Sequence, residues 1–101
     1  MKLYLDDKRA PPAGWTRVRT SQEAIEMLEE GNVSEISLDH DLGDDAKGTG
    51  YDVILWIEEA VFMRNFDPPK ITVHSANPSA RGKMEAGVQS IFRLHTRGQT
   101  R

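Results

Sequence analysis

The stretch EISLDHDLGDDAKGTGYDVILWIEEAV, residues 35–61, predicts a strand, a loop and a helix in succession. Its first four residues form a short apolar run, typical of a buried parallel strand, and the run ends abruptly at Asp39. Three glycines and mixed charge over residues 43–50 predict a flexible loop. A helix beginning near Thr49 is predicted by apolar residues at helical spacing: Tyr51, Ile54, Ile57 and Val61.

Two other apolar runs are also followed by polar residues. KLYL (2–5) precedes two aspartates, and it is continuous enough in apolar character to predict a central strand covered on both faces. KITVHS (70–75) predicts a third strand. The two remaining helices are marked by their end signals: Thr20 with Glu23 and Gly31 for the first, and Asn77 with Pro78 for the last.

Strands that alternate with helices predict an α/β fold with a mostly parallel sheet and helices on both faces. The segment TRVRT (16–20) adds a short edge strand. Its link to the first strand, residues 6–15, is short for a parallel crossover, which normally takes about a dozen residues or more. Either the proline-containing loop and Trp15 replace a helix, or the edge strand is not parallel.

The length and composition limit the classes of protein that remain. The 101 residues predict one domain, residues 1–94, followed by a polar tail, residues 95–101. The chain has no cysteine, so a metal would be bound by oxygen and imidazole. A net charge of −3 without a basic stripe argues against an extended nucleic-acid surface. No apolar stretch is long enough for a membrane span, and we expect a cytoplasmic protein.

Polar residues follow the three apolar runs at residues 2–5, 35–38 and 70–73. In open parallel sheets ligands bind outside the carboxyl ends of the strands, so we expect these residues to share one crevice. The aspartates Asp6, Asp7 and Asp39 are candidate ligands for a divalent ion such as Mg²⁺ or Mn²⁺, which would relieve the repulsion between carboxylates. Alternatively, the first two aspartates only end a strand and pair with Lys8 or Arg9.

His40 and His74 each lie beside a strand end. Imidazole titrates near neutrality, so two histidines flanking a phosphate can act as base and acid. Either one can instead be a partly buried structural histidine. The candidate phosphate-binding residues are Ser75, Asn77, Arg81 and Arg9. Asn77 can instead be used in capping, and Arg81 can instead face solvent.

The segments LYLDDKRAPPAGW, ISLDHDLG, GTGYDV and VHSANPSARGKM together resemble the cyclic-phosphate-processing receiver-like domain, a family related to response-regulator receivers. The resemblance spans Leu3 to about Met84. It implies a small flavodoxin- or receiver-like three-layer fold with a four-stranded sheet. It also implies that Asp39 matches the phosphate-accepting aspartate of an ordinary receiver. The fifth strand of a receiver, with its lysine, and the helix after the first strand are not found in the sequence.

The resemblance implies a phosphoesterase that acts on cyclic phosphates of nucleotides or RNA ends, with a divalent metal and with His40 and His74 as acid and base. Two other interpretations stay open. The chain can be a reduced receiver phosphorylated on Asp39, although the missing lysine argues against this. It can also be a module that binds a nucleotide or a partner protein without turnover.

Overall fold

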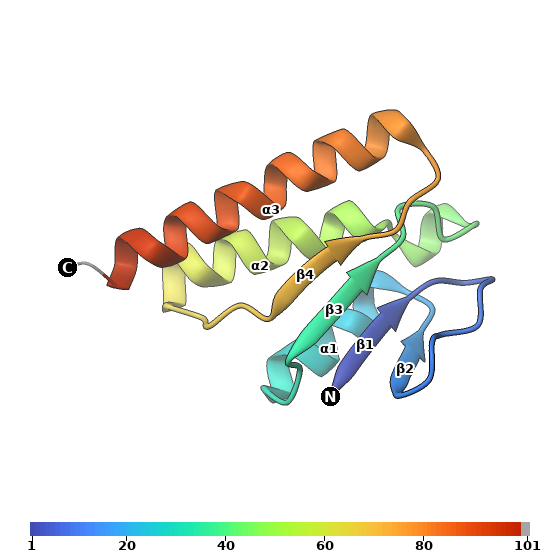
Figure 1. The fold of residues 1–101 in the computed structure, drawn as a ribbon, viewed down its shortest axis with the longest axis horizontal. Coiled ribbons are helices and arrows are strands. Elements are labelled where there is room, and N and C mark those ends of the chain that lie inside the picture. The colour runs from blue at the N-terminus through green and yellow to red at the C-terminus, as the bar shows by residue number, and fades with distance from the viewer. Residues whose placement is uncertain (100–101) are drawn as a thin grey trace.

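The computed structural model describes residues 1–99. Residues 2–73 contain four strands and two helices, and a long third helix follows them. In chain order the elements are β1 (Lys2–Leu5), β2 (Trp15–Val18), α1 (Ser21–Glu30), β3 (Glu35–Leu38), the 3₁₀ turn η1 (Asp45–Lys47), α2 (Gly50–Arg64), β4 (Lys70–Val73) and α3 (Pro78–Gln99). Figure 1 shows how these elements are arranged. The predicted α/β fold with a four-stranded sheet is confirmed.

The strand order is β2-β1-β3-β4, and every neighbouring pair is parallel. The edge strand β2 is therefore parallel to β1, although residues 6–14 between them contain no helix. A segment of this length can reach roughly 30 Å, whereas it must travel back along a strand of only about 13 Å. The proline-containing loop thus takes the place of a crossover helix. Of the two predicted alternatives, this one is confirmed, and a non-parallel edge strand is excluded.

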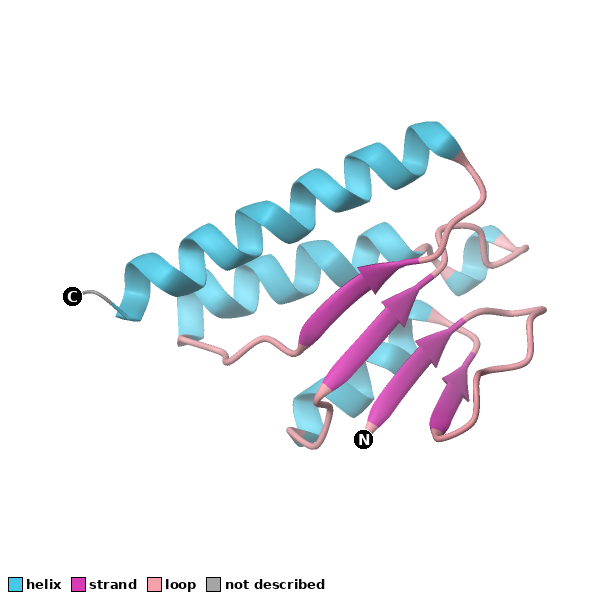
Figure 2. Ribbon diagram, in the orientation of Figure 1, coloured by secondary structure: helices cyan, strands magenta, loops and turns pink. Residues whose placement is uncertain are grey.

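The three helices pack on one face of the sheet, where helices on both faces were expected. In the view of Figure 2 no helix crosses in front of the strands, and α1 lies behind β1 and β3. The uncovered face is the one that a helix between β1 and β2 would cover, and a loop stands in its place. For the described residues the fold therefore has two layers rather than three.

Burial along the strands follows from this layering. Leu3 and Leu5 of β1 and Ile36 and Leu38 of β3 are fully buried beneath the helices. Tyr4, between the two leucines, is only partly buried because it lies on the opposite face. The prediction that KLYL is covered on both faces is therefore wrong. An aromatic ring on the polar face made the run look continuous.

The predicted helix ends are confirmed by their hydrogen bonds. The Thr20 side chain accepts from the Glu23 N–H at 3.1 Å, and Gly31 ends α1 in the left-handed conformation. Asn77 Oδ1 accepts the N–H groups of Ser79 and Ala80 at the start of α3. Of the predicted polar tail, residues 95–99 belong to α3, and residues 100–101 lie outside the described residues.

Among residues 1–99, none of the helices combines the length and the apolar character that a membrane crossing requires.

Candidate functional site

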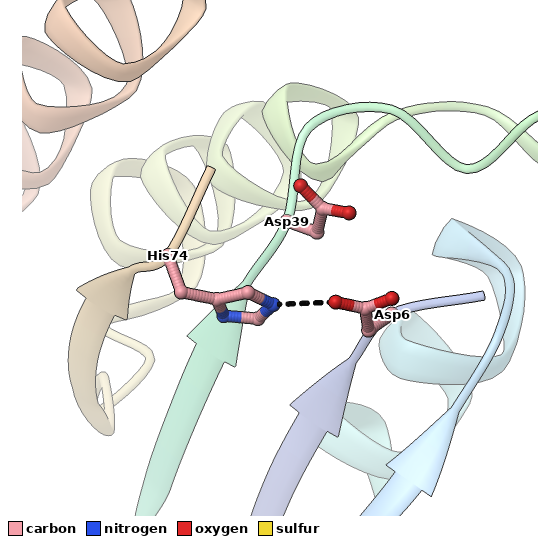
Figure 3. Close-up of side chains that lie close together, drawn as sticks. All are labelled: Asp6, Asp39 and His74. Carbon is pink, nitrogen blue, oxygen red and sulfur yellow. Dashed lines mark hydrogen bonds and ion pairs between the residues drawn. The ribbon is translucent and has the colours of Figure 1, made fainter. Parts of the chain in front are cut away.

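Three side chains from three strands meet at the carboxyl edge of the sheet (Figure 3). Asp6 follows β1, Asp39 follows β3 and His74 follows β4. One oxygen of each carboxylate and one ring nitrogen of the histidine all lie within 4.8 Å of one another. The N–H of Asp39 donates to the carbonyl of Leu5, and that of His74 donates to the carbonyl of Leu38, each at 3.0 Å. The backbone pairing of the sheet therefore brings the three groups together.

Asp6 is a buried carboxylate with only 1% of its surface exposed. Its Oδ1 accepts the backbone N–H groups of Lys8 at 2.8 Å and Arg9 at 2.9 Å. Its Oδ2 lies 3.4 Å from the Arg9 guanidinium and 3.1 Å from His74 Nε2. Burial by itself raises the pKa of Asp6, but these donors outweigh burial and the pKa is lowered overall. Asp6 is therefore ionised at neutral pH.

Both ring nitrogens of His74 have partners. An ionised carboxylate only accepts, so Nε2 carries the proton and donates to Asp6. Nδ1 of the neutral ring then accepts from the Ser37 hydroxyl at 2.7 Å. The Tyr4 ring stacks on the imidazole with 4.3 Å between centroids and an interplanar angle of 2°. Burial lowers the pKa of His74, and the bond to Asp6 offsets only part of this effect.

Asp39 is the least satisfied member of the group. Its Oδ1 accepts the N–H of His40 at 2.8 Å, which favours the charged form. Burial nevertheless raises the pKa of Asp39, and the negative charge of Asp6 raises it further. Two carboxylates held this close repel each other, and a bound cation would relieve the repulsion.

The loop after Asp39 folds back onto the strand end. The N–H of Gly50 donates to the carbonyl of His40 at 3.1 Å, and Asp41 forms an antiparallel bridge with Thr49. A Cβ atom at Gly50 would collide with the backbone carbonyl oxygen of Asp39. Only glycine allows this approach, so the first turn of α2 packs directly against the site.

Asp7 and His40, two further predicted site residues, lie outside the group of three. The Asp7 carboxylate is next to Gly43, where a Cβ atom would lie 2.9 Å from Asp7 Oδ2. The His40 ring places Nδ1 2.9 Å from Oδ1 of the neighbouring Asp41. Asp7 therefore lines the loop that follows β3, and the orientation of His40 depends on Asp41.

The four predicted phosphate-binding residues divide into two pairs. Arg9 lies at the site: its guanidinium contacts Asp6 and donates to the backbone carbonyl of His74 at 3.2 Å. Ser75 follows His74 and is 4% exposed, with its hydroxyl accepting the N–H of Asn77 at 3.2 Å. These two positions adjoin the group of three.

Asn77 and Arg81 are used elsewhere. The carbonyl of the Asn77 side chain caps α3, as its alternative interpretation predicted. Arg81 pairs with Glu85 one turn later at 3.5 Å, and both line a groove between β4 and α3 next to Ile71. The structure thus does not bring Arg81 to the carboxylates.

Sequence reasoning missed Ser37 and Tyr4, the two residues that hold the His74 ring. Both point to the open face of the sheet, and they are paired neighbours in the β1–β3 register. The available signal was a small polar residue inside the apolar run of β3, two positions before Asp39. Alternation along a strand places residues i and i+2 on one face, so Ser37 shares a face with Asp39.

The donor set of the group is chemically suited to a divalent transition metal. Carboxylate oxygens bind Mg²⁺ and Mn²⁺ alike, whereas an imidazole nitrogen suits first-row transition metals better than Mg²⁺. Asp6, Asp39 and His74 offer one ligand atom each. Ligation by His74 requires Nε2 to lose its proton, and the Ser37 hydroxyl can then accept from Nδ1.

The fold and the site together define a class of protein. Parallel strands in the order β2-β1-β3-β4, with acidic residues after β1 and β3, are the arrangement of a receiver-like domain. In this chain an imidazole from the end of β4 joins the two carboxylates. Comparison with known families agrees with this class. The model of the cyclic-phosphate processing receiver domain matches residues 1–90, and the chain belongs to this family.

Comparison with curated proteins and with solved structures gives no match.

Proposed function

We propose that the chain is a phosphoesterase that hydrolyses a cyclic phosphate on a nucleotide or on an RNA end. The observation that carries the proposal is the convergence of Asp6, Asp39 and His74 within 4.8 Å at the sheet edge. The description of the family, cyclic-phosphate processing, supports the substrate class. The reaction adds water at phosphorus, breaks one of the two ring P–O bonds and releases its oxygen as an alcohol, which leaves a phosphate monoester.

In this proposal Asp6, Asp39 and His74 hold a divalent ion, with Mn²⁺ favoured over Mg²⁺ by the imidazole. When bound, the ion polarises the phosphoryl oxygens and offsets the charge that develops on them. Arg9, half exposed and already next to Asp6, contacts the same phosphate through its second guanidinium nitrogen. Asp7, beside the loop that follows β3, orients a water molecule.

Proton transfer is assigned to His40. Its Nδ1–H donates to Asp41, which leaves Nε2 as the basic nitrogen of the neutral ring. His40 takes a proton from the attacking water and returns it to the departing alkoxide, so that no proton is gained or lost overall. The sequence also predicted an acid–base role for His74. That role would use Nε2, the same atom that would bind the metal ion, so proton transfer is assigned to His40 alone.

The test is phosphorus NMR of the purified protein with a panel of cyclic phosphates. The panel contains 2′,3′-cyclic nucleotides, an RNA oligomer with a cyclic end and ADP-ribose 1″,2″-cyclic phosphate, each with Mn²⁺, Mg²⁺ or EDTA. We expect a cyclic resonance to convert to a monoester resonance only when metal is present. His40→Gln, His74→Gln and Asp39→Asn should each lower turnover by ~10²-fold or more.

The matched control is His95→Gln, which removes the third histidine of the chain from the distant end of α3. It should keep the wild-type rate. Absence of conversion across the whole panel contradicts the proposal. Wild-type rates in both His40→Gln and His74→Gln contradict the assignment of the histidines while leaving the reaction in place.

The position of Asp39 supports one alternative function. Asp39 lies at the end of β3, where a receiver carries its phosphate-accepting aspartate, with Ser75 beside it after β4. Within residues 1–99, however, β4 is the last strand, so no fifth strand supplies a lysine. Incubation with acetyl phosphate followed by intact-mass measurement distinguishes the two functions. A stable phosphoryl adduct that Asp39→Asn abolishes would favour signalling over hydrolysis.

A further inference from the structure

The sheet face that the helices leave open carries a distinctive set of side chains. Alternation along the strands and the parallel register place them together: Lys2 and Tyr4 from β1, Trp15 and Arg17 from β2, Glu35 and Ser37 from β3, Lys70 and Thr72 from β4. Figure 2 is viewed toward this face, with the strands in front. The face combines cations, aromatic rings and hydroxyl groups.

The strand residues of this face differ in charge from the chain as a whole. Within β1 to β4 they include three cations, Lys2, Arg17 and Lys70, and one carboxylate, Glu35, whereas the chain carries −3. The two carboxylates of the candidate site, Asp6 and Asp39, lie beyond the strand ends. Lys2 and Lys70 are both exposed. The strand part of the face is therefore positive on an acidic protein, and it is complementary to the phosphates of a polyanion.

The aromatic side chains form a connected group on the same face. The Tyr4 ring contacts Trp15 edge to face with 6.4 Å between centroids, and its own face stacks on His74. The Lys2 ammonium lies 5.8 Å from the centre of the Trp15 ring. Both aromatic rings are only partly buried. In one common class of RNA-binding domain, aromatic rings exposed on a four-stranded sheet stack two or three bases of single-stranded RNA.

This face leads directly into the candidate site. Tyr4, Ser37 and Thr72 are paired neighbours across three strands. Asp6, Asp39 and His74 stand two residues further along the same strands, and two residues of extended chain return to the same face. The three site residues are therefore the last row of the open face. A strand of RNA with its end at the site would run from that row toward Lys2 and Lys70.

We propose that the open face of the sheet binds the two or three nucleotides that precede a cyclic 3′ end of single-stranded RNA. The inference rests on the proposed function and names its substrate class, an RNA terminus in preference to a free cyclic mononucleotide. A base stacks on Trp15 and its neighbour contacts the exposed edge of Tyr4, because one face of the Tyr4 ring is already stacked on His74. The phosphates between the bases contact Lys2, Arg17 and Lys70. The face measures about 14 by 13 Å, so the footprint is small and agrees with the lack of an extended basic surface.

The test compares two probes: a fluorescein-labelled RNA hexamer with a 2′,3′-cyclic end, and the corresponding 2′,3′-cyclic mononucleotide. Fluorescence anisotropy measures hexamer affinity at several salt concentrations, and phosphorus NMR measures turnover of both. We expect Trp15→Ala to weaken hexamer binding roughly fivefold to a hundredfold. Removing the two lysines, K2Q with K70Q, should reduce the slope of log affinity against log salt by about 1.4.

The matched control removes two cations from α3, K83Q with R93Q. It lowers the net charge by the same amount on an element away from the open face, so the salt slope should stay at the wild-type value. Because Trp15 also packs at the sheet edge, circular dichroism checks each variant, and the lysine pair tests the face independently of packing.

The outcomes separate this inference from the proposed function. Hexamer binding that depends on Trp15 and the two lysines, without turnover of either probe, supports the RNA-binding face and contradicts the enzyme. Equal turnover of both probes, unchanged in the variants, supports the enzyme and overturns the RNA-binding face. A hexamer that binds no more tightly than the mononucleotide also overturns it.

Discussion

His74 has three neighbours that constrain its ring in different ways. Asp6 accepts from Nε2, Ser37 donates to Nδ1, and Tyr4 lies parallel to the ring at 4.3 Å between centroids. The Asp6 carboxylate, which only accepts, determines the tautomer, and the stacked Tyr4 ring fixes the plane of the imidazole. Because a serine hydroxyl can donate or accept, this arrangement also suits the opposite tautomer, which a metal at Nε2 would require.

The partly buried, neutral His74 predicts a dependence of stability on pH. Its pKa lies below the ordinary value of 6.5 in the folded state, so the unfolded chain binds more protons as the pH falls through 6.5. The free energy of unfolding should therefore decrease from pH 7 toward the lowered pKa of His74. Asp6, whose pKa is lowered from 3.8, adds a second loss only below about that pH.

Urea unfolding between pH 5 and pH 8 measures this effect. The His74→Gln variant keeps an amide donor for Asp6 but cannot titrate, so its stability should vary less over the upper part of the range. His40→Gln is the control, because His40 pairs with the exposed Asp41. Equal pH dependence in wild type and His74→Gln would contradict the lowered pKa of the partly buried His74.

At the scale of elements, glycines control how closely the helices approach their neighbours. Gly50 opens α2 directly against the Asp39 carbonyl. Gly87 lies where α3 crosses α2, and a Cβ atom there would be 2.6 Å from Cγ2 of Ile54. Gly82, also in α3, has open space around the same position. Comparing substitutions at these three glycines separates the effect of close packing on stability from the effect of helix propensity.

Alanine at these three positions should have different effects. Gly82→Ala should stabilise the protein by about 0.5–1 kcal/mol, because alanine is the better helix former. Gly87→Ala should destabilise it by about 1–3 kcal/mol through overpacking against Ile54. Gly50→Ala should displace the start of α2 and weaken both stability and activity. Denaturant unfolding measures all three, and a stabilised Gly50→Ala variant would contradict the close approach to Asp39.

At the scale of the whole molecule, the site lies where strands far apart in the sequence end together. A ligand that binds only this assembled edge stabilises the fold as a whole. Mn²⁺ at a hundredfold excess over its dissociation constant should raise the free energy of unfolding by about 2.7 kcal/mol. EDTA should reverse the effect, and Mg²⁺ should require higher concentrations because His74 contributes nitrogen.

Asp39→Asn provides the sharpest check of this prediction. Replacing the carboxylate removes its repulsion with Asp6, so the metal-free protein should gain about 0.5–2 kcal/mol. The same change removes a ligand, so added Mn²⁺ should no longer stabilise the fold. Glu26→Gln, on α1, is the control and should respond to Mn²⁺ as the wild type does. A full Mn²⁺ response in Asp39→Asn would rule Asp39 out as a ligand.

The sequence alone determined the order of the elements, a mostly parallel sheet and the residues at its carboxyl edge, but it left the direction of the edge strand open. Apolar runs that end in Asp6, Asp39 and His74 are local patterns, and the caps at Thr20 and Asn77 are local hydrogen bonds, so both were predictable. The order of strands and helices along the chain could not assign the helices to faces of the sheet, because this order is the same whether helices cover one side or two.

Only the tertiary structure decided which face of the sheet the helices cover and which side chains meet at the candidate site. The loop at residues 6–14 left one face of the sheet open, so Tyr4 and Ser37 point outward to the His74 ring instead of into a core. Asp7 lies next to Gly43, which is distant in the sequence. Arg81 pairs with Glu85 because residues four apart lie on the same side of a helix. Sequence patterns identify which residues end a strand, whereas packing across strands selects which of them meet.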